Sequence, residues 1–230
     1  MRFRTSYSSS DGNQQPGHPI VLLPGWATDC RVFDGVGRTA TAIVPQGLIT
    51  DDFSTDLADY LHGERSSTVR LCGWSLGGAA ALRFARAYPE MVDDIVLFGV
   101  RPRYPAVGID EAWERLRADR EAYLADFYRR CFLPGQRDDF RRFKQTLMSD
   151  YLANFSEGDL LRGLDFLAES AFDAVDLSIR PTTVVHGALD IVAPVAEIAD
   201  LAAQADFHVV ADAAHAVFLA PPAKVWWPHE

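Results

Sequence analysis

A serine flanked by glycines stands where a short apolar run gives way to an alanine-rich segment. The motif G-W-S-L-G, residues 73–77, follows the apolar run 69–72 and precedes the segment 79–87. This order is typical of a nucleophile elbow, a strand–turn–helix unit whose sharp turn exposes a serine hydroxyl above a sheet. Small residues at both ends of the motif allow the strand and the helix to pass closely. The motif indicates nucleophilic attack by Ser75 on an acyl carbonyl; a glycine-rich turn with a capping serine is the alternative.

A serine hydroxyl needs a general base before it can attack a carbonyl, and the sequence contains six histidines. His215 follows the last apolar run and stands among alanines, which let an imidazole reach the serine. The others stand in the N-terminal segment, at a predicted helix end, in two predicted strands and near the C-terminus: His18, His62, His186, His208 and His229. The chain order of this motif, serine then acid then histidine, favours His215 as the base.

The acid that orients the histidine is expected in the loop after the preceding strand. The apolar run 183–186 leads into G-A-L-D, which ends at Asp190, and a proline then suits the first turn of a helix. A carboxylate at this position can accept the hydrogen bond from Nδ1 of His215 and stabilise the imidazolium. Three alternatives remain, one in the same loop as the histidine and two at the end of a helical segment: Asp212, Asp173 and Asp176.

Acyl transfer also needs hydrogen-bond donors for the negative oxygen of the tetrahedral intermediate. One donor is the backbone N–H of Leu76, which follows the nucleophile at the start of a helix. The other is expected in the loop after the apolar run Ile20–Leu23, where Trp26 follows Gly25. We therefore assign the Trp26 N–H as the second donor. Its indole can line an acyl pocket or belong to the core, and the two roles are compatible.

The elements that must position these residues alternate along the chain. Short apolar runs bounded by turn residues predict strands over Ile20–Leu23, 42–44, 69–72, 95–98, 183–186 and 207–210, with 2–7 as a further candidate. Helical patterns lie between them over 54–62, with Ser54 as N-cap, and over 76–88 and 194–204. Such alternation predicts an α/β fold, in which helices cover a mostly parallel sheet.

The strand pattern disappears between residues 101 and 176. Apolar residues recur there at helical spacing, and the stretch from Ser156 to Asp159 resembles a capping box before a further helix. We therefore predict two parts: a core formed by residues 1–100 and 177–230, and a helical cap, residues 101–176, inserted in that core. Such a cap would cover the carboxyl ends of the strands, where open α/β sheets bind ligands.

Composition excludes several classes of protein. The chain has 230 residues, of which 48% are hydrophobic and 23% charged, as expected for a globular domain with a substantial core. Its net charge of −10 argues against non-specific binding to nucleic acid. No apolar run approaches the length that spans a membrane, and the N-terminal segment lacks the apolar stretch of a secretion signal. Three widely spaced cysteines, which suggest neither disulfides nor a metal site, favour a cytoplasmic location.

The charge is unevenly distributed along the chain. Residues 101–150 contain 11 basic and 9 acidic side chains, whereas the rest of the chain contains 11 basic and 23 acidic ones. The predicted cap is therefore the more basic part of an acidic protein, and this difference needs an explanation of its own.

Three basic residues of the predicted cap recur at helical spacing. Arg137, Arg141 and Lys144 stand at i, i+4 and i+7 and so share one face of a helix. Two interpretations stay open. The face attracts an acidic partner, or its charges are simply solvated and paired with neighbours, as Asp138 and Arg142 can be at i, i+4.

Taken together, these motifs resemble those of the alpha/beta hydrolases. The pattern reads P-G-W after a strand, then G-W-S-L-G-G, G-x-L-D-x-x-x-P and A-A-H-A-x-F, over nearly the whole chain. Among these enzymes the chain is most similar to the pimeloyl-[acyl-carrier-protein] methyl ester esterases of biotin synthesis. The resemblance implies the nucleophile, acid and base, followed by the two oxyanion-hole residues: Ser75, Asp190, His215, Trp26 and Leu76.

The sequence departs from that family at three positions. Pro24, Ala27 and Val217 stand where members often have histidine, glycine and proline. None of these changes removes a catalytic group. The basic stretch 137–144 resembles the cap helix with which that family contacts its acyl carrier protein, so the resemblance implies a carrier-binding role for the basic face described above.

The resemblance implies a serine carboxylesterase that hydrolyses the methyl ester of pimeloyl-[acyl-carrier protein] and needs no cofactor or metal. A serine at position 75 argues against the dehalogenases and epoxide hydrolases of this fold, which use aspartate there. The same triad serves short-chain esterases, thioesterases and C–C bond hydrolases, so these remain alternatives. A non-catalytic binding module on the same scaffold is a further alternative, although all three catalytic residue types are present.

Overall fold

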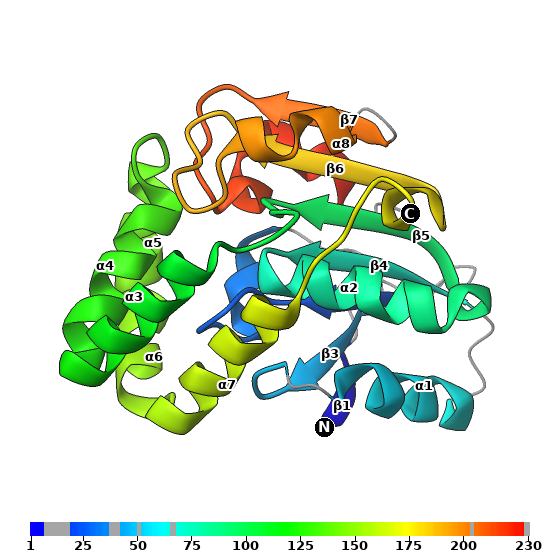
Figure 1. Ribbon diagram of the computed structural model, residues 1–230, viewed down its shortest axis with the longest axis horizontal. Helices are drawn as coiled ribbons and strands as arrows, with labels where there is room; N and C mark the ends of the chain where they lie inside the picture. Colours follow the sequence, from blue (N-terminus) through cyan, green and yellow to red (C-terminus); the bar gives the residue numbers. More distant parts are fainter. Residues whose placement is uncertain (7–18, 37–41, 50–51, 65–67, 203–204, 228–230) are drawn as a thin grey trace, which may run out of the picture.

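The computed structural model describes residues 1–6, 19–36, 42–49, 52–64, 68–202 and 205–227. A seven-stranded sheet with the order β1-β3-β2-β4-β5-β6-β7 forms the centre of this part of the chain (Figure 1). Its strands are β1 (Arg2–Ser6), β2 (Ile20–Leu23), β3 (Ala42–Gln46), β4 (Val69–Trp74), β5 (Val92–Phe98), β6 (Thr182–Gly187) and β7 (Asp206–Val210). The β1–β3 pair is antiparallel and the other pairs are parallel, which confirms the predicted α/β fold.

The central strands are apolar on both faces, as expected for strands that are covered on both sides. Leu22 on β2, Cys72 on β4 and Val96 on β5 are neighbours in register, and each is at most 5% exposed. Several strands extend beyond their predicted bounds. One example is β5, which begins at Val92, because two aspartates after this residue interrupt the apolar run on which the prediction rests.

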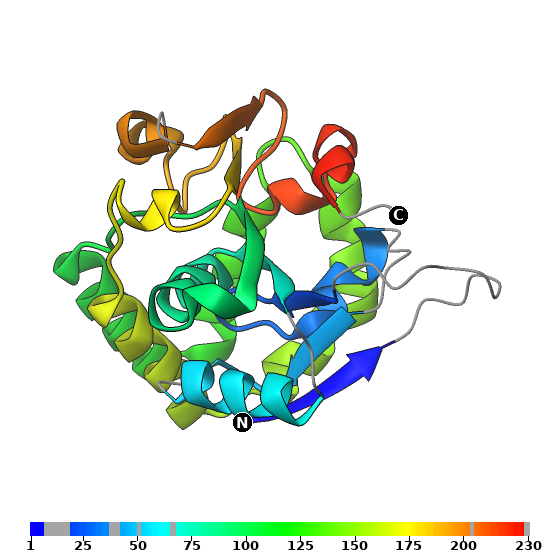
Figure 2. The ribbon, with the colours of Figure 1, turned by 90° about the vertical axis from the view of Figure 1, so that its right-hand side faces the viewer.

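Helices α1 (Phe53–Gly63) and α2 (Leu76–Ala87) cover one side of the sheet. Figure 2 shows them on the opposite side of the strands from the 3₁₀ turns Val217–Leu219 and Pro221–Trp226 near the C-terminus. The sheet is therefore enclosed between two layers. Helix α2 follows β4 directly, so the turn between them lies at the carboxyl end of a central strand.

Two helix predictions were wrong in detail. Helix α1 has Asp52 rather than Ser54 as its N-cap, so Ser54 lies inside the first turn. The predicted helix 194–204 consists of a 3₁₀ turn, Val195–Glu197, and the short helix α8 (Ala199–Ala202); residues 203–204 lie outside the described part. Pro194 has an extended backbone, with ψ 130°, and so precedes the turn instead of opening a helix.

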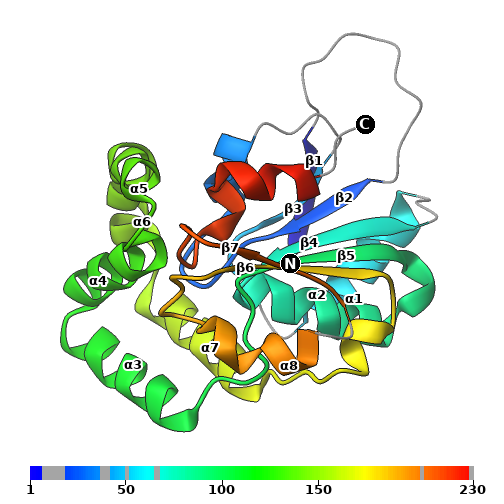
Figure 3. The same ribbon diagram turned by 90° about the horizontal axis from the view of Figure 1, so that it is seen from above.

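The chain between β5 and β6 is mainly helical. Its helices are α3 (Ala106–Ala118), α4 (Arg120–Phe132), α5 (Arg137–Phe143), the π-helical segment Lys144–Met148, α6 (Ser149–Asn154) and α7 (Glu157–Glu169). Figure 3 shows α3 to α6 grouped beyond one end of the sheet, while α7 returns along it. The N-cap of the predicted capping box is confirmed, since the Ser156 hydroxyl accepts the Asp159 N–H at 3.1 Å; the Asp159 carboxylate in turn accepts from the Ser156 hydroxyl at 2.6 Å rather than from its backbone N–H. The division of the chain into core and cap domains remains a proposal.

Three features of the described residues bear on the kind of site to expect. Among the residues that the structure describes, no helix is long and apolar enough to cross a membrane. The same residues contain no cluster of three or more His, Cys, Asp or Glu side chains suited to a metal ion. Cys30, Cys72 and Cys131 are all unpaired thiols.

Candidate active site

Ser75 occupies a sharp turn between β4 and α2. Its backbone has φ 54° and ψ −117°, a conformation that costs a residue with a side chain about 1–3 kcal/mol. The turn is held because the Ser75 N–H donates to the Phe98 carbonyl on the neighbouring strand at 2.9 Å, and the Ser75 carbonyl accepts the Gly78 N–H at 2.9 Å. The serine thus has the strand–turn–helix surroundings that its motif predicts.

Glycine at position 77 allows this turn to fit against the end of β2. A Cβ atom on Gly77 would overlap the carbonyl oxygen of Leu23 and lie 2.7 Å from that of Pro24. A Cβ atom on Gly73 would in turn lie 2.5 Å from the Gly77 carbonyl oxygen. The contact of Gly73 with the start of α2 agrees with the predicted close approach of strand and helix, whereas the contact of Gly77 with the chain that leaves β2 was not predicted.

His215 and Asp190 form a buried pair at the ends of β7 and β6. Nδ1 of His215 lies 2.8 Å from Oδ2 of Asp190, and both side chains are fully buried. Oδ1 of Asp190 accepts the N–H groups of Val192 and Ala193 at 2.9 and 2.8 Å. The carbonyl of His215 accepts the indole N–H of Trp74, the residue before the serine, at 2.9 Å. These contacts give the imidazole a defined orientation next to the serine turn.

The pKa of Asp190 lies below its usual range. Burial acts to raise it, but the charge of His215 and the hydrogen bonds from His186 and His215 lower it more strongly. The carboxylate is therefore ionised at neutral pH and can stabilise an imidazolium at position 215. His186 has a supporting position: its Nε2 lies 2.6 Å from the Ala193 carbonyl oxygen and 3.4 Å from Oδ2 of Asp190.

Tyr104, in the segment after β5, contacts the candidate nucleophile. Its hydroxyl lies 3.3 Å from Oγ of Ser75. Nε2 of His215 has no hydrogen-bond partner among the described residues, so the structure joins His215 to Asp190 but not to Ser75 by a hydrogen bond. Burial raises the pKa of Tyr104 to about 12 although the Ser75 contact acts to lower it. The Tyr104 hydroxyl is therefore protonated at neutral pH.

The segment after β2, residues 24–31 (the β2 loop), which runs into the start of the 3₁₀ helix Cys30–Val36, carries the predicted oxyanion donor Trp26. Its indole is 4% exposed and donates from Nε1 to the Leu160 carbonyl on α7 at 2.9 Å. The backbone N–H groups of Trp26 and Leu76 form no hydrogen bond with any other described residue. Their role as donors to a negative oxygen remains a proposal.

A strained residue follows Trp26 in the β2 loop. Ala27 has φ 56°, a left-handed conformation that favours glycine. Its carbonyl accepts the hydroxyl of Tyr128 on α4 at 2.7 Å, and the hydroxyl of Thr28 donates to the Gly25 carbonyl at 2.9 Å. Ala27, which stands where the similar family often has glycine, is therefore held in an unfavourable conformation by α4.

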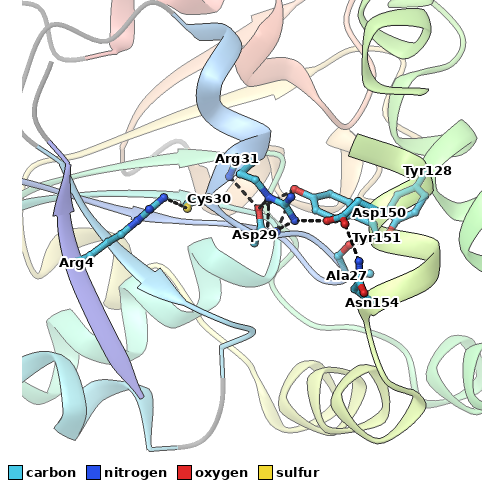
Figure 4. Close-up of polar contacts among 9 residues, drawn as sticks. All are labelled: Arg4, Ala27, Asp29, Cys30, Arg31, Tyr128, Asp150, Tyr151 and Asn154. Carbon is cyan, nitrogen blue, oxygen red and sulfur yellow. Dashed lines mark hydrogen bonds and ion pairs between the residues drawn. The ribbon is translucent and has the colours of Figure 1, made fainter. Parts of the chain in front are cut away.

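An ionic cluster ties the far end of the β2 loop to α6 (Figure 4). Arg31 donates to Oδ2 of Asp29 at 2.7 Å and to Oδ2 of Asp150 at 2.6 Å. The Tyr151 hydroxyl donates to Oδ1 of Asp29 at 2.9 Å, and the Asn154 amide donates to Asp150 at 2.6 Å. The β2 loop is consequently attached to the helices at both ends.

The segment that carries the base, residues 211–216 (the histidine loop), is held from the same helices. Gln136, between α4 and α5, accepts the Ala214 N–H through Oε1 at 3.0 Å and donates through Nε2 to the Ala216 carbonyl at 2.9 Å. The Ala216 N–H donates to the Cys131 carbonyl at 2.8 Å. The residues on both sides of His215 are therefore fixed by one buried amide side chain.

A cavity of about 210 Å³ opens beside Ser75, between the ends of the strands and helices α3, α4 and α7. Trp26 and Tyr104 line it together with apolar side chains such as Phe127, Leu164, Leu167 and Ile191. The Trp26 indole is thus both a core side chain and part of the cavity wall. Charged and hydroxyl-bearing side chains line the rest of the cavity, so its wall is mixed; the apolar part suits the acyl chain of a small ester.

The other candidates for the acid have partners elsewhere or are exposed. Asp212 is exposed, in the turn after β7. Asp176 is buried, but its two oxygens accept 2.8 and 2.5 Å hydrogen bonds from Arg86. Asp173 accepts the N–H of Val175 at 2.8 Å. Among the candidates, Asp190 is the one that the structure places against His215.

Of the remaining histidines, the two that the structure describes lie away from Ser75 and have other surroundings. His62 is exposed in the last turn of α1, and His208 lies 2.9 Å from Oδ1 of Asp206 on its own strand. His18 and His229 lie outside the described residues.

The predicted basic face lies at the surface. Arg137 and Arg141 are exposed on α5, and Lys144 is exposed at the start of the π-helical segment. The expected ion pair was Asp138 with Arg142 at i, i+4. Asp138 instead pairs with Arg141 at i, i+3, at 2.9 Å. One of the three cations is thus partly neutralised within the helix, while all three side chains remain accessible.

Sequence reasoning did not find three side chains that hold the site: Tyr104, Tyr128 and Gln136. The contact of Tyr104 spans 29 positions in the chain, that of Tyr128 spans 101, and the two hydrogen bonds of Gln136 span 78 and 80. Local spacing carries no information about contacts at such separations. The available signal is the residue type alone, a polar group in a segment otherwise expected to be apolar.

Known proteins resemble the chain in sequence and in fold. The alpha/beta hydrolase family matches residues 18–226. A pimeloyl-[acyl-carrier protein] methyl ester esterase of Aromatoleum aromaticum is 28% identical over 232 residues, covering 88% of this chain and 93% of the relative. The AB hydrolase superfamily protein YisY of Bacillus subtilis is 28% identical over 212 residues, covering 77% of this chain and 76% of the relative.

Among solved structures, a thermophilic esterase from Thermogutta terrifontis has a similar fold. The TM-score is 0.77, with 97% of this chain and 89% of that chain covered, at 22% sequence identity. Likeness at that identity concerns the fold alone. The family match over residues 18–226 shows that the chain is an alpha/beta hydrolase, and the solved structures show the same fold.

Proposed function

The chain belongs to the alpha/beta hydrolase family, and we propose that it is a serine carboxylesterase. The observation that carries the proposal is the buried His215–Asp190 pair, in which Nδ1 and Oδ2 lie 2.8 Å apart. The backbone carbonyl of His215 accepts the indole N–H of Trp74, which precedes the strained Ser75. Ser75 is the nucleophile, His215 the general base, and Asp190 the acid that orients the base.

The proposed reaction uses these three side chains in sequence. Oγ of Ser75 attacks the ester carbonyl carbon while Nε2 of His215 takes the hydroxyl proton. Asp190 stabilises the imidazolium, which then protonates the departing alcohol. Water attacks the acyl-enzyme in the same way and releases the acid. Since Ser75 Oγ contacts the Tyr104 hydroxyl at 3.3 Å, we expect a bound ester to turn the serine toward the imidazole.

The negative oxygen of each tetrahedral intermediate is assigned to the backbone N–H groups of Trp26 and Leu76. Donors of this kind stabilise charge that develops in the transition state, and losing one costs about 10²–10³ in kcat. The proposal is supported by the position of Leu76 at the N-terminus of α2, where the helix dipole also favours negative charge.

For the substrate, we propose the methyl ester of pimeloyl-[acyl-carrier protein]. The relative from Aromatoleum aromaticum, of which 93% is covered, bears the name of this activity. An acidic carrier would be repelled by most of this acidic chain, whereas Arg137, Arg141 and Lys144 offer it an exposed basic face beside the cavity-bearing helices. Three unpaired thiols suit a reducing compartment, so the proposed location is the cytoplasm.

Labelling with a fluorophosphonate tests the proposed nucleophile. We expect the wild-type protein to form a covalent adduct at Ser75 and to hydrolyse p-nitrophenyl esters. Ser75→Ala should abolish both, by about 10³ or more, with unchanged circular dichroism, because the hydroxyl supplies chemistry rather than buried volume. Near-wild-type turnover in the purified variant would refute the proposal.

A pair of substrates tests the carrier. The kcat/KM for pimeloyl-carrier methyl ester should fall as salt rises, while that for a short p-nitrophenyl ester should change little. Arg137→Glu combined with Arg141→Glu should impair the carrier-linked ester selectively. The control, Arg117→Glu combined with Arg162→Glu, changes the net charge equally on α3 and α7. Equal effects of the two double variants, or no preference for the carrier-linked ester, would favour a general short-chain esterase.

A further inference from the structure

The active-site cavity ends between α3 and α4 at a group of charged side chains. Arg115 and Glu111 on α3 and Arg130 on α4 line it, and all three are at least 30% exposed at their side chains. Tyr123 links this end to the reaction centre, since its ring centroid is 6.2 Å from that of Trp26 and 4.9 Å from the guanidinium carbon of Arg115. Ser75 and both arginines line the same cavity, so a ligand that fills it contacts the reaction centre at one end and the arginines at the other.

Positive charge is in excess at this end of the cavity. Arg115, Arg129 and Arg130 approach the single carboxylate of Asp126 at 3.5, 2.8 and 3.3 Å. Glu111 lies 3.8 Å from Arg115 and is 68% exposed, so it supplies only a weak, screened contact. Three guanidinium groups thus share two carboxylates, and one positive charge is left without a matching negative charge.

The arginines are also incompletely hydrogen-bonded. Nε of Arg130 is buried and forms no hydrogen bond within the described residues, although it lies 3.3 Å from Asp126. Arg101, which lines the cavity as well, differs in this respect: Glu197 accepts from its Nε and Nη2 at 2.5 and 2.7 Å. Arg101 is therefore a satisfied ion pair, whereas Arg115 and Arg130 retain donors for a ligand.

We infer that Arg115 and Arg130 form an anion-binding subsite, which accepts a carboxylate or phosphate carried by the substrate at the end remote from the scissile ester. This inference rests on the proposed esterase function and names the substrate class of that site. Guanidinium groups suit such anions because their planar N–H donors match two oxygens at once. The anion could belong to a free half-ester of a dicarboxylic acid or to the phosphate of a carrier's prosthetic arm.

Matched esters test the subsite in the full-length protein. The first pair is the monomethyl and the dimethyl ester of one dicarboxylic acid, so that chain length is equal and only the charge differs. The ratio of their kcat/KM values should favour the charged ester and fall roughly tenfold in Arg115→Gln and in Arg130→Gln. Arg117→Gln, also on α3 but outside the cavity lining, is the control and should leave the ratio unchanged.

A variant that should raise the ratio of kcat/KM values, rather than lower it, sharpens the test. Asp126→Asn removes the shared carboxylate, so the ratio should rise roughly threefold. A second pair of substrates, a phosphopantetheine thioester of the half-ester and its N-acetylcysteamine analogue without phosphate, identifies the source of the anion. A loss confined to the phosphate-bearing thioester assigns the subsite to the carrier arm, and a loss confined to the free half-ester assigns it to a carboxylate; both support the inference.

Unchanged ratios in the folded Arg115→Gln and Arg130→Gln proteins would overturn the inference while leaving the esterase proposal intact. If the wild-type protein hydrolyses none of the esters, the proposed function fails, and calorimetry with the free dicarboxylate then tests the subsite alone. Binding that weakens in Arg115→Gln would support the subsite, and the absence of binding would refute it. Should both variants misfold, inhibition of the wild-type protein by the dicarboxylate but not by its diamide is the result expected.

Discussion

The histidine loop and the β2 loop border the same serine, but the helices hold them in different ways. Gln136 makes two hydrogen bonds to the histidine loop, in which no residue has a positive φ. Tyr128 makes one hydrogen bond to the β2 loop, at Ala27, whose φ is 56°. The first loop is fastened in a relaxed conformation, whereas the second is fastened in a strained one.

This difference predicts what each loop loses without its hydrogen bond to the helices. The histidine loop would lose order, whereas the β2 loop would lose its backbone conformation. A relaxed loop that loses a support becomes less ordered but keeps its preferred backbone shape. A strained loop that loses a support can leave that shape altogether, because an alanine in the left-handed region is about 1 kcal/mol or more less stable than in its usual conformation. The donor proposed at Trp26 is therefore more sensitive to the helices than the base at His215.

The largest expected effect concerns Asp190, which orients His215 of the histidine loop. Asp190→Asn should lower kcat by about 10⁴, because asparagine favours the wrong tautomer of His215 while preserving the shape of the site. Steady-state kinetics with a p-nitrophenyl ester would measure it. Asp212→Asn, in the exposed turn of the histidine loop, is the matched control and should change kcat little. If Asp212 proved the sensitive position, the acid would be wrongly assigned.

The second prediction breaks the contact between the serine turn and the β2 loop. Gly77→Ala should destabilise the protein by about 3 kcal/mol or more, since the added methyl group overlaps the Leu23 carbonyl oxygen, and backbone cannot move aside as a side chain can. Urea unfolding would measure the loss. Gly63→Ala is the control, because a Cβ atom there meets nothing within 4 Å. A loss below about 1 kcal/mol at position 77 would show that the turn can shift.

The third prediction removes the support of the histidine loop. Gln136→Leu leaves the Ala214 N–H and the Ala216 carbonyl buried without partners, and should cost about 2–4 kcal/mol of stability. We expect kcat to fall and KM to change little, because the loop carries the base rather than a binding surface. Gln145→Leu, at an exposed position of the π-helical segment, supplies the control. Equal stability of the two variants would mean that the amide does not support the loop.

The fourth prediction separates strain from support in the β2 loop. Tyr128→Phe removes the hydrogen bond to Ala27 and should lower kcat roughly tenfold, equivalent to about 1–2 kcal/mol. Ala27→Gly should restore most of this loss in the double variant, because glycine adopts a positive φ without strain. Rates of fluorophosphonate labelling in the four proteins of this cycle would measure the coupling. Additive effects of the two substitutions would contradict the proposed role of strain.

Much of the framework follows from local patterns in the sequence. Apolar runs predict the strands because each buried strand must be apolar over its own short length. The serine motif predicts its turn, because Gly73 lies at the close approach of the strand and the helix that the turn connects. Asp190 and His215 could be predicted from their positions after two strands, since parallel strands bring their carboxyl ends to one edge.

Local patterns were less informative where a residue type suits more than one position around the start of a helix. Ser54 and Pro194 both suit the start of a helix, yet Asp52 occupies the N-cap position of α1, without a side-chain hydrogen bond, and Pro194 remains extended. Capping preferences of neighbouring polar residues differ by only a few tenths of a kcal/mol, so packing of the helix against the sheet selects among them. Ala27 shows the same limit, because its identity gives no sign that its φ is 56°.

The sequence by itself therefore determined the order of the strands along the chain, the serine turn and the residues that follow the strand ends. The tertiary structure decided which distant side chains hold those residues in place. Tyr128 and Gln136 reach loops 101 and about 80 residues away, and such contacts depend on how the helices settle on the sheet. Packing is a property of the assembled surfaces, so no short stretch of sequence contains it.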